Sequence, residues 1–246
     1  MMMLCSWSTQ VHAVANMTPL WTFPIYPLLL ISPMAAGVIP NQPRERAEEM
    51  IVAAVAFQGI GFMIAVMIYS AYIYRLMTRK LPGSAARPGM FISVGPSSFT
   101  VIGIVQLGRA MEWGGVMAEV VKLGSLVVGM WLWGLACWFF LVAAGANAWS
   151  FRKHRLGFSL SWWSFVFPNT AFTLATFAIG DALGSRGIKL LGTVVATALV
   201  VVWTIVLAMT VRGVVRKEIL WRGAGEDRDE RVFVTRVITG GTIPPD

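Results

Sequence analysis

Ionisable and metal-binding residues are scarce in this chain of 246 residues. It contains two cysteines, two histidines and 13% charged residues, whereas a soluble domain carries about a quarter charged residues. Cys5 and Cys137 are too few for a disulfide framework or a cysteine-based metal site. His12 and His154 lie outside the long apolar runs, so neither is placed for a metal centre or a proton relay. We therefore predict neither a metal nor a cofactor.

Catalytic and nucleic-acid-binding patterns are missing as well. The sequence has no Ser–His–Asp set, no paired carboxylates and no His–Cys cluster, so we do not expect an enzyme. A formal net charge of +8 would suit nucleic acid, but no basic stripe with interleaved aromatic residues lies on a polar segment. We expect no nucleic-acid partner, and the basic residues serve better as markers of membrane topology.

Long apolar runs dominate what is present. Hydrophobic residues make up 57% of the chain, the mean hydropathy is +0.68, and charge gathers in the gaps between runs. A helix needs roughly 20 residues to cross the hydrocarbon core, and six segments are long enough. The expected spans are Thr18–Val38, Met50–Leu76, Met90–Ala110, Lys122–Asn147, Ser161–Ile179 and Ile188–Arg212. This pattern predicts an all-α integral membrane protein with the lipid bilayer as its first partner.

Three prolines recur at a fixed interval. Pro24, Pro96 and Pro168 are 72 residues apart and lie in the first, third and fifth spans, while the other three spans are longer and free of proline. A proline inside a helix removes an amide donor and kinks the helix. The order predicts three hairpins, each a kinked helix followed by a straight one. Such breaks persist in lipid mainly where they face protein or a watery cavity, so the repeat indicates a pathway.

Basic loops set the expected orientation. The loops after the second and fourth spans carry basic residues and no acid, which places them in the cytoplasm together with both termini. Their basic residues are Arg75, Arg79, Lys80 and Arg87, and then Arg152, Lys153 and Arg155. We accordingly divide the chain into an N-terminal loop remnant (1–16), a transmembrane domain (17–212) and a cytosolic C-terminal tail (213–246).

Polar residues form one face on each of two kinked spans. Ser93, Ser97 and Thr100 lie at positions i, i+4 and i+7, and Asn169, Thr173 and Thr176 repeat that spacing. Neutral hydroxyl and amide groups beside a kink can solvate an anion without holding it tightly, which makes these residues candidates to line a pore. The alternative is that they bond across helix contacts or to their own backbone, and the sequence leaves both open.

Two phenylalanines flank the second polar face. Phe165 and Phe167 precede Pro168, and an aromatic ring in a narrow pore can gate by blocking or dewetting it. Spacing favours Phe165, which lies four residues before Asn169. The alternative is a ring that faces lipid or fills the core.

Charge at the end of the third span has two interpretations. Arg109 and Glu112 lie close together there in the sequence. The first interpretation is a mutual surface pair, and the second is an arginine vestibule that attracts anions.

Four sequence motifs resemble a known family of membrane proteins. The resemblance is to the tellurite-resistance/dicarboxylate transporter family, most closely to its fungal malic acid transporter branch, with plant slow anion channels and fungal sulfite efflux pumps as related members. It runs from about Met17 to Arg212. The motifs are Met17-Thr-Pro-Leu-Trp-Thr-Phe-Pro-Ile-Tyr-Pro, Ala56-Phe-Gln-Gly-Ile-Gly-Phe-Met, Arg87-Pro-Gly-Met-Phe-Ile-Ser-Val-Gly-Pro-Ser-Ser-Phe-Thr and Trp162-Trp-Ser-Phe-Val-Phe-Pro-Asn-Thr.

The resemblance implies ten helices in five hairpins around a central pore, which the kinked helices line and a phenylalanine plugs. Its Trp-Trp-x-x-x-Phe-Pro pattern assigns the gate to Phe167, against the Phe165 that spacing favours, and the conflict stays open. This chain resembles the last three hairpins only. We therefore expect an N-terminal truncation, an inactive form, or a form that needs another chain, such as a homo-oligomeric copy, to complete the pore.

The function that the resemblance implies is plasma-membrane transport of a C4 dicarboxylate such as malate, as in voltage-dependent anion channels. The alternatives are sulfite efflux and a non-transporting membrane subunit. A membrane potential that is negative inside opposes anion uptake by about 2.3 kcal/mol per charge per 100 mV. Uptake of a dianion would therefore need proton coupling or a protonated substrate, although the expected spans contain no carboxylate or histidine.

Overall fold

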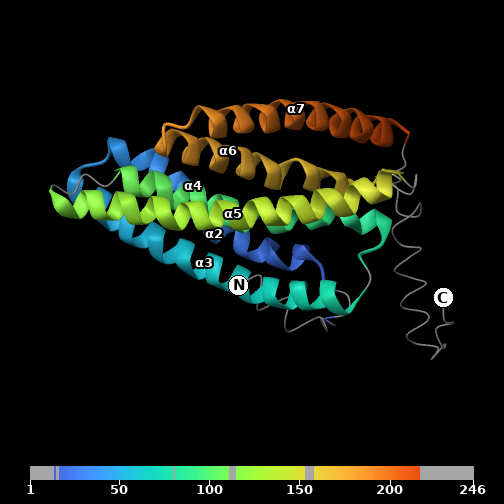
Figure 1. Ribbon diagram of the computed structural model, residues 1–246, viewed down its shortest axis with the longest axis horizontal. Coiled ribbons are helices and arrows are strands. Elements are labelled where there is room, and N and C mark those ends of the chain that lie inside the picture. Colours follow the sequence, from blue (N-terminus) through green and yellow to red (C-terminus); the bar gives the residue numbers. More distant parts are fainter. Residues whose placement is uncertain (1–13, 15–16, 80, 111–114, 153–157, 217–246) are drawn as a thin grey trace. The chain divides into compact units, whose positions relative to one another are not determined.

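The computed structural model describes residues 14, 17–79, 81–110, 115–152 and 158–216, and every regular element among them is helical (Figure 1). The chain divides into two units, Met1–Trp203 and Thr204–Asp246. The boundary falls inside the last helix, and the described start of the second unit continues as helix to Val215. The core and the sites discussed below belong to the first unit.

Three broken elements alternate with three long helices, as the proline repeat predicts. The broken elements are η2 (Pro19–Ile25), α2 (Tyr26–Val38) and η3 (Ile39–Asn41); η4 (Ser84–Ser93) and α4 (Val94–Ala110); and η5 (Leu160–Phe165) and α6 (Phe167–Ala182). The long helices are α3 (Arg44–Thr78), α5 (Val116–Arg152) and α7 (Arg186–Val215). The all-helical membrane fold class expected from the sequence is confirmed.

Within the described ranges, five helices are long and apolar enough to cross a membrane. They are Pro19–Asn41, Arg44–Thr78, Ala85–Ala110, Val116–Trp149 and Arg186–Val215. The segment expected as a further span, Ser161–Ile179, is divided between η5 and α6. Because α6 has 16 residues, it is shorter than the roughly 20 that a continuous spanning helix needs.

Helix α4 forms the centre of the packed helices. It contacts α2, α5 and α6 (Figure 1). In the most apolar stretch of η4 and α4 together, 89% of residues are buried, against 28% for α3 and 22% for α5. The outer faces of α3 and α5 expose large apolar side chains, which lipid tails can cover. The third expected span, which carries one of the two polar faces, is therefore the one most enclosed by protein.

Close packing around α4 depends on Gly103. A Cβ atom added there would lie 2.6 Å from the Ser32 Cβ and 3.2 Å from the Pro33 Cδ of α2. Ser32 also donates a hydrogen bond of 2.8 Å to the Ala54 carbonyl of α3. Small residues let membrane helices approach closely enough for such contacts. Gly103 is thus where three helices meet.

The turn from α6 to α7 has a specific backbone structure. Gly184 has a φ of +62°, a conformation that glycine adopts without steric cost. The Ser185 amide donates to the Gly180 carbonyl at 2.9 Å, and the Gly184 amide to the Asp181 carbonyl at 3.4 Å. These are the two hydrogen bonds of a Schellman motif, which ends α6 and fixes Asp181 at its last turn.

We expect Gly103→Ala to lower the free energy of unfolding by about 1–3 kcal/mol, because the added methyl overpacks the contact with Ser32. Gly134→Ala in α5 is the matched control, since a Cβ there meets nothing within 4 Å. Thermal unfolding of the purified protein in detergent would measure both variants. Equal melting temperatures would contradict a packing role for Gly103.

Candidate functional site

Each of the three repeated prolines lies where a 3-10 segment gives way to an α-helix. Pro24 is the sixth residue of η2, Pro96 is the third residue of α4, and Pro168 is the second residue of α6. The first turn of an α-helix tolerates proline because an amide at that position has no intrahelical partner in any case. Two α-helices, α4 and α6, consequently begin inside apolar segments, where their first amides give a partial positive charge.

Pro96 has no amide to donate to the Ile92 carbonyl, and a neighbouring helix supplies a donor in its place. A residue with an amide at position 96 could donate to the Ile92 carbonyl, and proline cannot. The Tyr26 hydroxyl of α2 donates to that carbonyl at 2.8 Å. Gly95 provides the room, since a Cβ atom there would lie 2.9 Å from the Tyr26 Cζ. The break in α4 and the start of α2 therefore form one unit.

A second bond ties α3 to the same break. The Thr100 hydroxyl donates to the Pro96 carbonyl at 2.7 Å, and the Gln58 amide of α3 donates to the Thr100 oxygen at 2.8 Å. Gln58 is 2% exposed. A side-chain amide buried among apolar helices is expensive unless it is bonded, so this contact fixes α3 against α4.

The following broken helix has an equivalent connection. The Trp133 indole of α5 donates to the Thr176 oxygen of α6 at 3.0 Å, and the Thr176 hydroxyl donates to the Phe172 carbonyl at 2.8 Å. In both cases a long helix donates to a threonine on the next broken helix along the chain. The hairpins are thus joined by the same type of bond.

Most of the expected pore-lining residues are buried and donate to their own helix. Ser93 bonds the Met90 carbonyl at 2.7 Å, and Thr173 bonds the Asn169 carbonyl at 2.8 Å, as Thr100 bonds that of Pro96. These are the backbone contacts that the sequence left as an alternative. Such bonds occupy the hydroxyl hydrogen, so the oxygens of these three residues present acceptors to their surroundings.

Ser97 and Asn169 differ from the rest of this set. Among the described residues, neither the Ser97 Oγ nor the Asn169 Oδ1 has a hydrogen-bond partner, although Ser97 is fully buried and Asn169 is 6% exposed. The Asn169 Nδ2 donates to the Phe165 carbonyl at 2.9 Å, which fixes the amide so that its oxygen is the free atom. Ser97 can therefore donate and Asn169 can accept, at the starts of two packed helices, α4 and α6.

The two candidate gate rings have different surroundings. The Phe165 ring packs among Phe91, Phe151 and Trp162, with centroid distances of 5.3, 6.3 and 5.8 Å. The Phe167 ring lies 5.7 Å from Tyr26, and it is 46% exposed. Its other ring neighbour is Phe99 at 5.5 Å. Phe167, which begins α6, thus contacts the other two broken elements and is partly exposed, whereas Phe165 is held in a cluster.

Sequence reasoning missed the partners of the broken helices. Tyr26 and Gln58 lie within the motifs that resemble the family, but the sequence pattern predicts no role for either of them or for Trp133. A lone glutamine in a 27-residue apolar span is a signal that could have identified Gln58. Glu112, the expected neighbour of Arg109, lies outside the described residues.

These features together define a class: a membrane protein of broken and continuous helices in which polar groups gather at the breaks. The family described as "Voltage-dependent anion channel" matches residues 1–211, so the chain belongs to the voltage-dependent anion channel family. This family comprises membrane anion channels and transporters, not enzymes.

Individual relatives agree with this assignment. The chain is 26% identical to the malic acid transport protein of Schizosaccharomyces pombe, over 97% of this chain and 56% of that protein. It is 25% identical to the sulfite efflux pump SSU1 of Trichophyton rubrum, over 84% of this chain and 56% of that protein. The chain therefore spans about half the length of the curated relatives it matches. No solved structure matches it.

We expect Tyr26→Phe to lower the free energy of unfolding by about 1 kcal/mol, because the Ile92 carbonyl loses its hydroxyl donor in a medium without water. Tyr74→Phe on the exposed part of α3 is the matched control, since Tyr74 is 62% exposed. Chemical denaturation in detergent micelles would give both values. A loss of the same size in the two variants would contradict the role assigned to the Tyr26 hydroxyl.

Proposed function

We propose that the chain takes part in transmembrane transport of C4 dicarboxylates such as malate, at the plasma membrane and with both termini in the cytoplasm. The observation that carries the proposal is the pair of unpartnered polar atoms, Ser97 Oγ and Asn169 Oδ1, at the starts of α4 and α6. The names of the relatives, a malic acid transport protein and a sulfite efflux pump, support a small oxyanion as substrate. The malate-transporting relative matches more of this chain than the sulfite pump does, which favours a dicarboxylate.

The broken helices would supply the chemistry of such a pathway. The positive ends of α4 and α6 favour an anion without a fixed cation that would trap it. The Ser97 hydroxyl would donate to a substrate carboxylate, and the Asn169 oxygen would accept from the hydroxyl of malate or from a protonated carboxyl. Ser93, Thr100 and Thr173 would line the same route, but they contribute less because their hydrogens bond the backbone.

Phe167 is the better candidate for the gate. Its ring lies against Tyr26 of α2 and Phe99 of α4, so rotation of this one side chain of α6 would change contacts to the other two broken elements. Phe165 would have to leave an aromatic cluster in order to move. Aromatic contacts of this kind contribute about 0.5–1.5 kcal/mol each, which favours a structural role for Phe165.

Uptake of malate against the membrane potential would be coupled to protons through the substrate. About 2.3 kcal/mol per charge per 100 mV opposes entry of an anion, and protonation of one carboxyl halves that cost for malate. The unpartnered Asn169 oxygen could accept a hydrogen bond from such a carboxyl. Malate uptake into proteoliposomes with and without a pH gradient tests this, and equal rates would contradict coupling.

We expect Phe167→Ala to raise malate flux severalfold, because it removes the ring at the open side of the breaks. Phe165→Ala should instead lower the free energy of unfolding by about 3 kcal/mol, since it empties an aromatic cluster. Flux into proteoliposomes and thermal unfolding, measured on both variants, separate the two roles. A rise in malate flux for Phe165→Ala, with no rise for Phe167→Ala, would assign the gate to Phe165 instead.

We expect Ser97→Ala to reduce malate flux about fivefold, the effect of losing one hydrogen bond of about 1 kcal/mol. Ser98→Ala is a closely matched control, because Ser98 is equally buried but its hydroxyl already donates to the Val94 carbonyl at 2.8 Å. A Ser98→Ala effect as large as that of Ser97→Ala would argue against a role in conduction.

The same assay separates the alternative functions. Sulfite that is itself transported and that competes for malate flux would favour the sulfite efflux reading. A chain that carries no flux alone, but co-purifies with a longer relative and alters its flux, would be a membrane subunit.

A further inference from the structure

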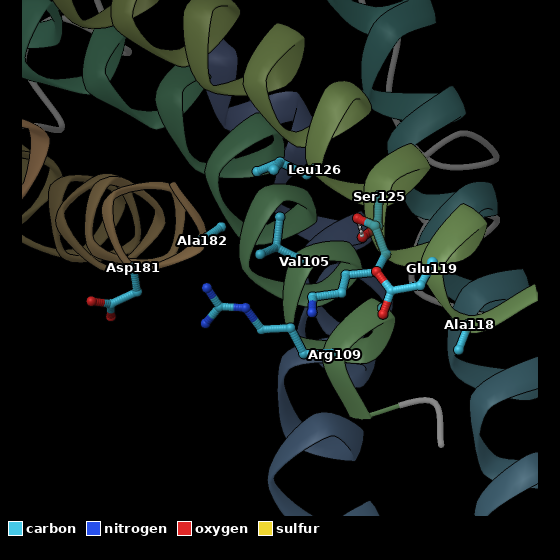
Figure 2. A pocket seen from close by; sticks show the side chains of 10 residues that line it. Val105, Arg109, Ala118, Glu119, Ser125, Leu126, Asp181 and Ala182 are labelled. Carbon is cyan, nitrogen blue, oxygen red and sulfur yellow. Dashed lines mark hydrogen bonds between the residues drawn. The ribbon is translucent and has the colours of Figure 1, made fainter. Parts of the chain in front are cut away.

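A cavity of about 410 Å³ lies where α4 and α6 end and α5 begins, far along α4 from the break at Pro96 (Figure 2). Its polar lining comprises Arg109, Glu119, Lys122, Ser125 and Asp181. Sites for small molecules occupy about 300–1,000 Å³, so the size suits a small organic anion. In Figure 2, Arg109 extends from α4 on the side of Asp181, while Glu119 and Ser125 project from α5.

Packing between α4 and α5 brings the two cations of this cavity together. A Cβ atom at Gly108 would lie 2.8 Å from the Cβ of Ser125, so the absent side chain lets α5 approach α4 closely. Arg109 follows Gly108 directly, and Lys122 lies one turn before Ser125. Both cations therefore lie close in sequence to this contact between the two helices.

The charge of the cavity is positive in balance. Asp181 is paired with Lys189 at 2.6 Å, so its charge is already compensated at the rim. Neither Arg109 nor Lys122 forms an ion pair with a described carboxylate. Among the described lining residues, two cations against the remaining carboxylate, Glu119, leave one positive charge in excess. An anion that enters would meet a guanidinium fork, which matches carboxylate geometry, and an ammonium point charge.

Arg109 also borders a second cavity. This one has a volume of about 400 Å³ and lies toward α2 and α3, where Arg44 and Glu48 form an ion pair of 3.0 Å. Because Arg109 lines both cavities, an anion can approach its guanidinium group from either cavity. The basic loops lie at the opposite ends of these helices, so the charge rule places Arg109 at the outer membrane surface.

We infer that this cavity is an anion-binding vestibule for a small carboxylate, with Arg109 and Lys122 as its cationic residues and Glu119 as the residue that limits its affinity. This inference rests on the proposed function for its ligand class. The vestibule is a binding site separate from the pathway residues Ser97 and Asn169, about one helix length away along α4 and α6. The vestibule concentrates dicarboxylate at the outer end of α4, as positive clefts do for anionic substrates.

Equilibrium binding of L-malate to the purified chain in lipid nanodiscs, followed by calorimetry, tests the vestibule. We expect Arg109→Gln and Lys122→Gln each to raise Kd about fivefold, and Glu119→Gln to lower it about twofold, since the side chains are exposed to solvent. Arg109→Lys should fall between wild type and Arg109→Gln, because it keeps the charge and loses the fork. Raising the ionic strength should weaken binding.

Arg46→Gln is the matched control, since Arg46 is an exposed cation at the same end of the helices that borders neither cavity. Thermal unfolding of every variant shows that it is folded. No saturable malate binding by wild type, or a Kd that Arg46→Gln changes as much as Arg109→Gln, would overturn the vestibule.

Flux in proteoliposomes keeps the two proposals distinguishable. If Arg109→Gln and Lys122→Gln leave the KM for external malate unchanged, the transport proposal is retained and the vestibule is overturned. Absence of flux, with the charge-dependent binding pattern intact in nanodiscs, supports the vestibule and removes the proposed function.

Discussion

Backbone groups freed by proline must find partners where no water is available, and the arrangement of these helices follows from that requirement. The clearest case is the Tyr26 hydroxyl, which donates to the Ile92 carbonyl, to which Pro96 has no amide to donate. An unsatisfied carbonyl in hydrocarbon costs several kcal/mol, so α2 cannot separate from α4 without a large penalty. Gly95 and Gly103 then provide the space that this close approach requires.

The same requirement links one hairpin to the next. Gln58 reaches from α3 to Thr100, and Trp133 reaches from α5 to Thr176, so each long helix donates to the broken helix that follows it. A bond of this kind satisfies a buried polar side chain and orients a threonine whose own hydrogen is already used. The repeat in the sequence is therefore also a repeat in how the helices are joined.

The sequence predicted the fold well because its signals are local. Apolar runs, proline spacing and basic loops define the helices and their order, and the motifs identify the family. The bond between the Tyr26 hydroxyl and the Ile92 carbonyl was not predictable, because it depends on packing between residues 66 apart in the chain. The segment around Pro168 was expected as one span, but the change from 3-10 to α-helix at Val166 divides it. The surroundings that distinguish Phe165 from Phe167 are likewise tertiary contacts, on which spacing carries no information.

Equivalent positions of the repeat are not chemically equivalent. Ser97 and Asn169 are 72 residues apart and begin adjacent helices in the same way, but one offers a hydrogen and the other a lone pair. The two repeats therefore offer a hydrogen-bond donor at one position and an acceptor at the equivalent position. A small molecule with an acceptor at one end and a donor at the other would lie between the two helices in one orientation and not in the reverse. Two neutral side chains would thus set the orientation of the substrate between the helices.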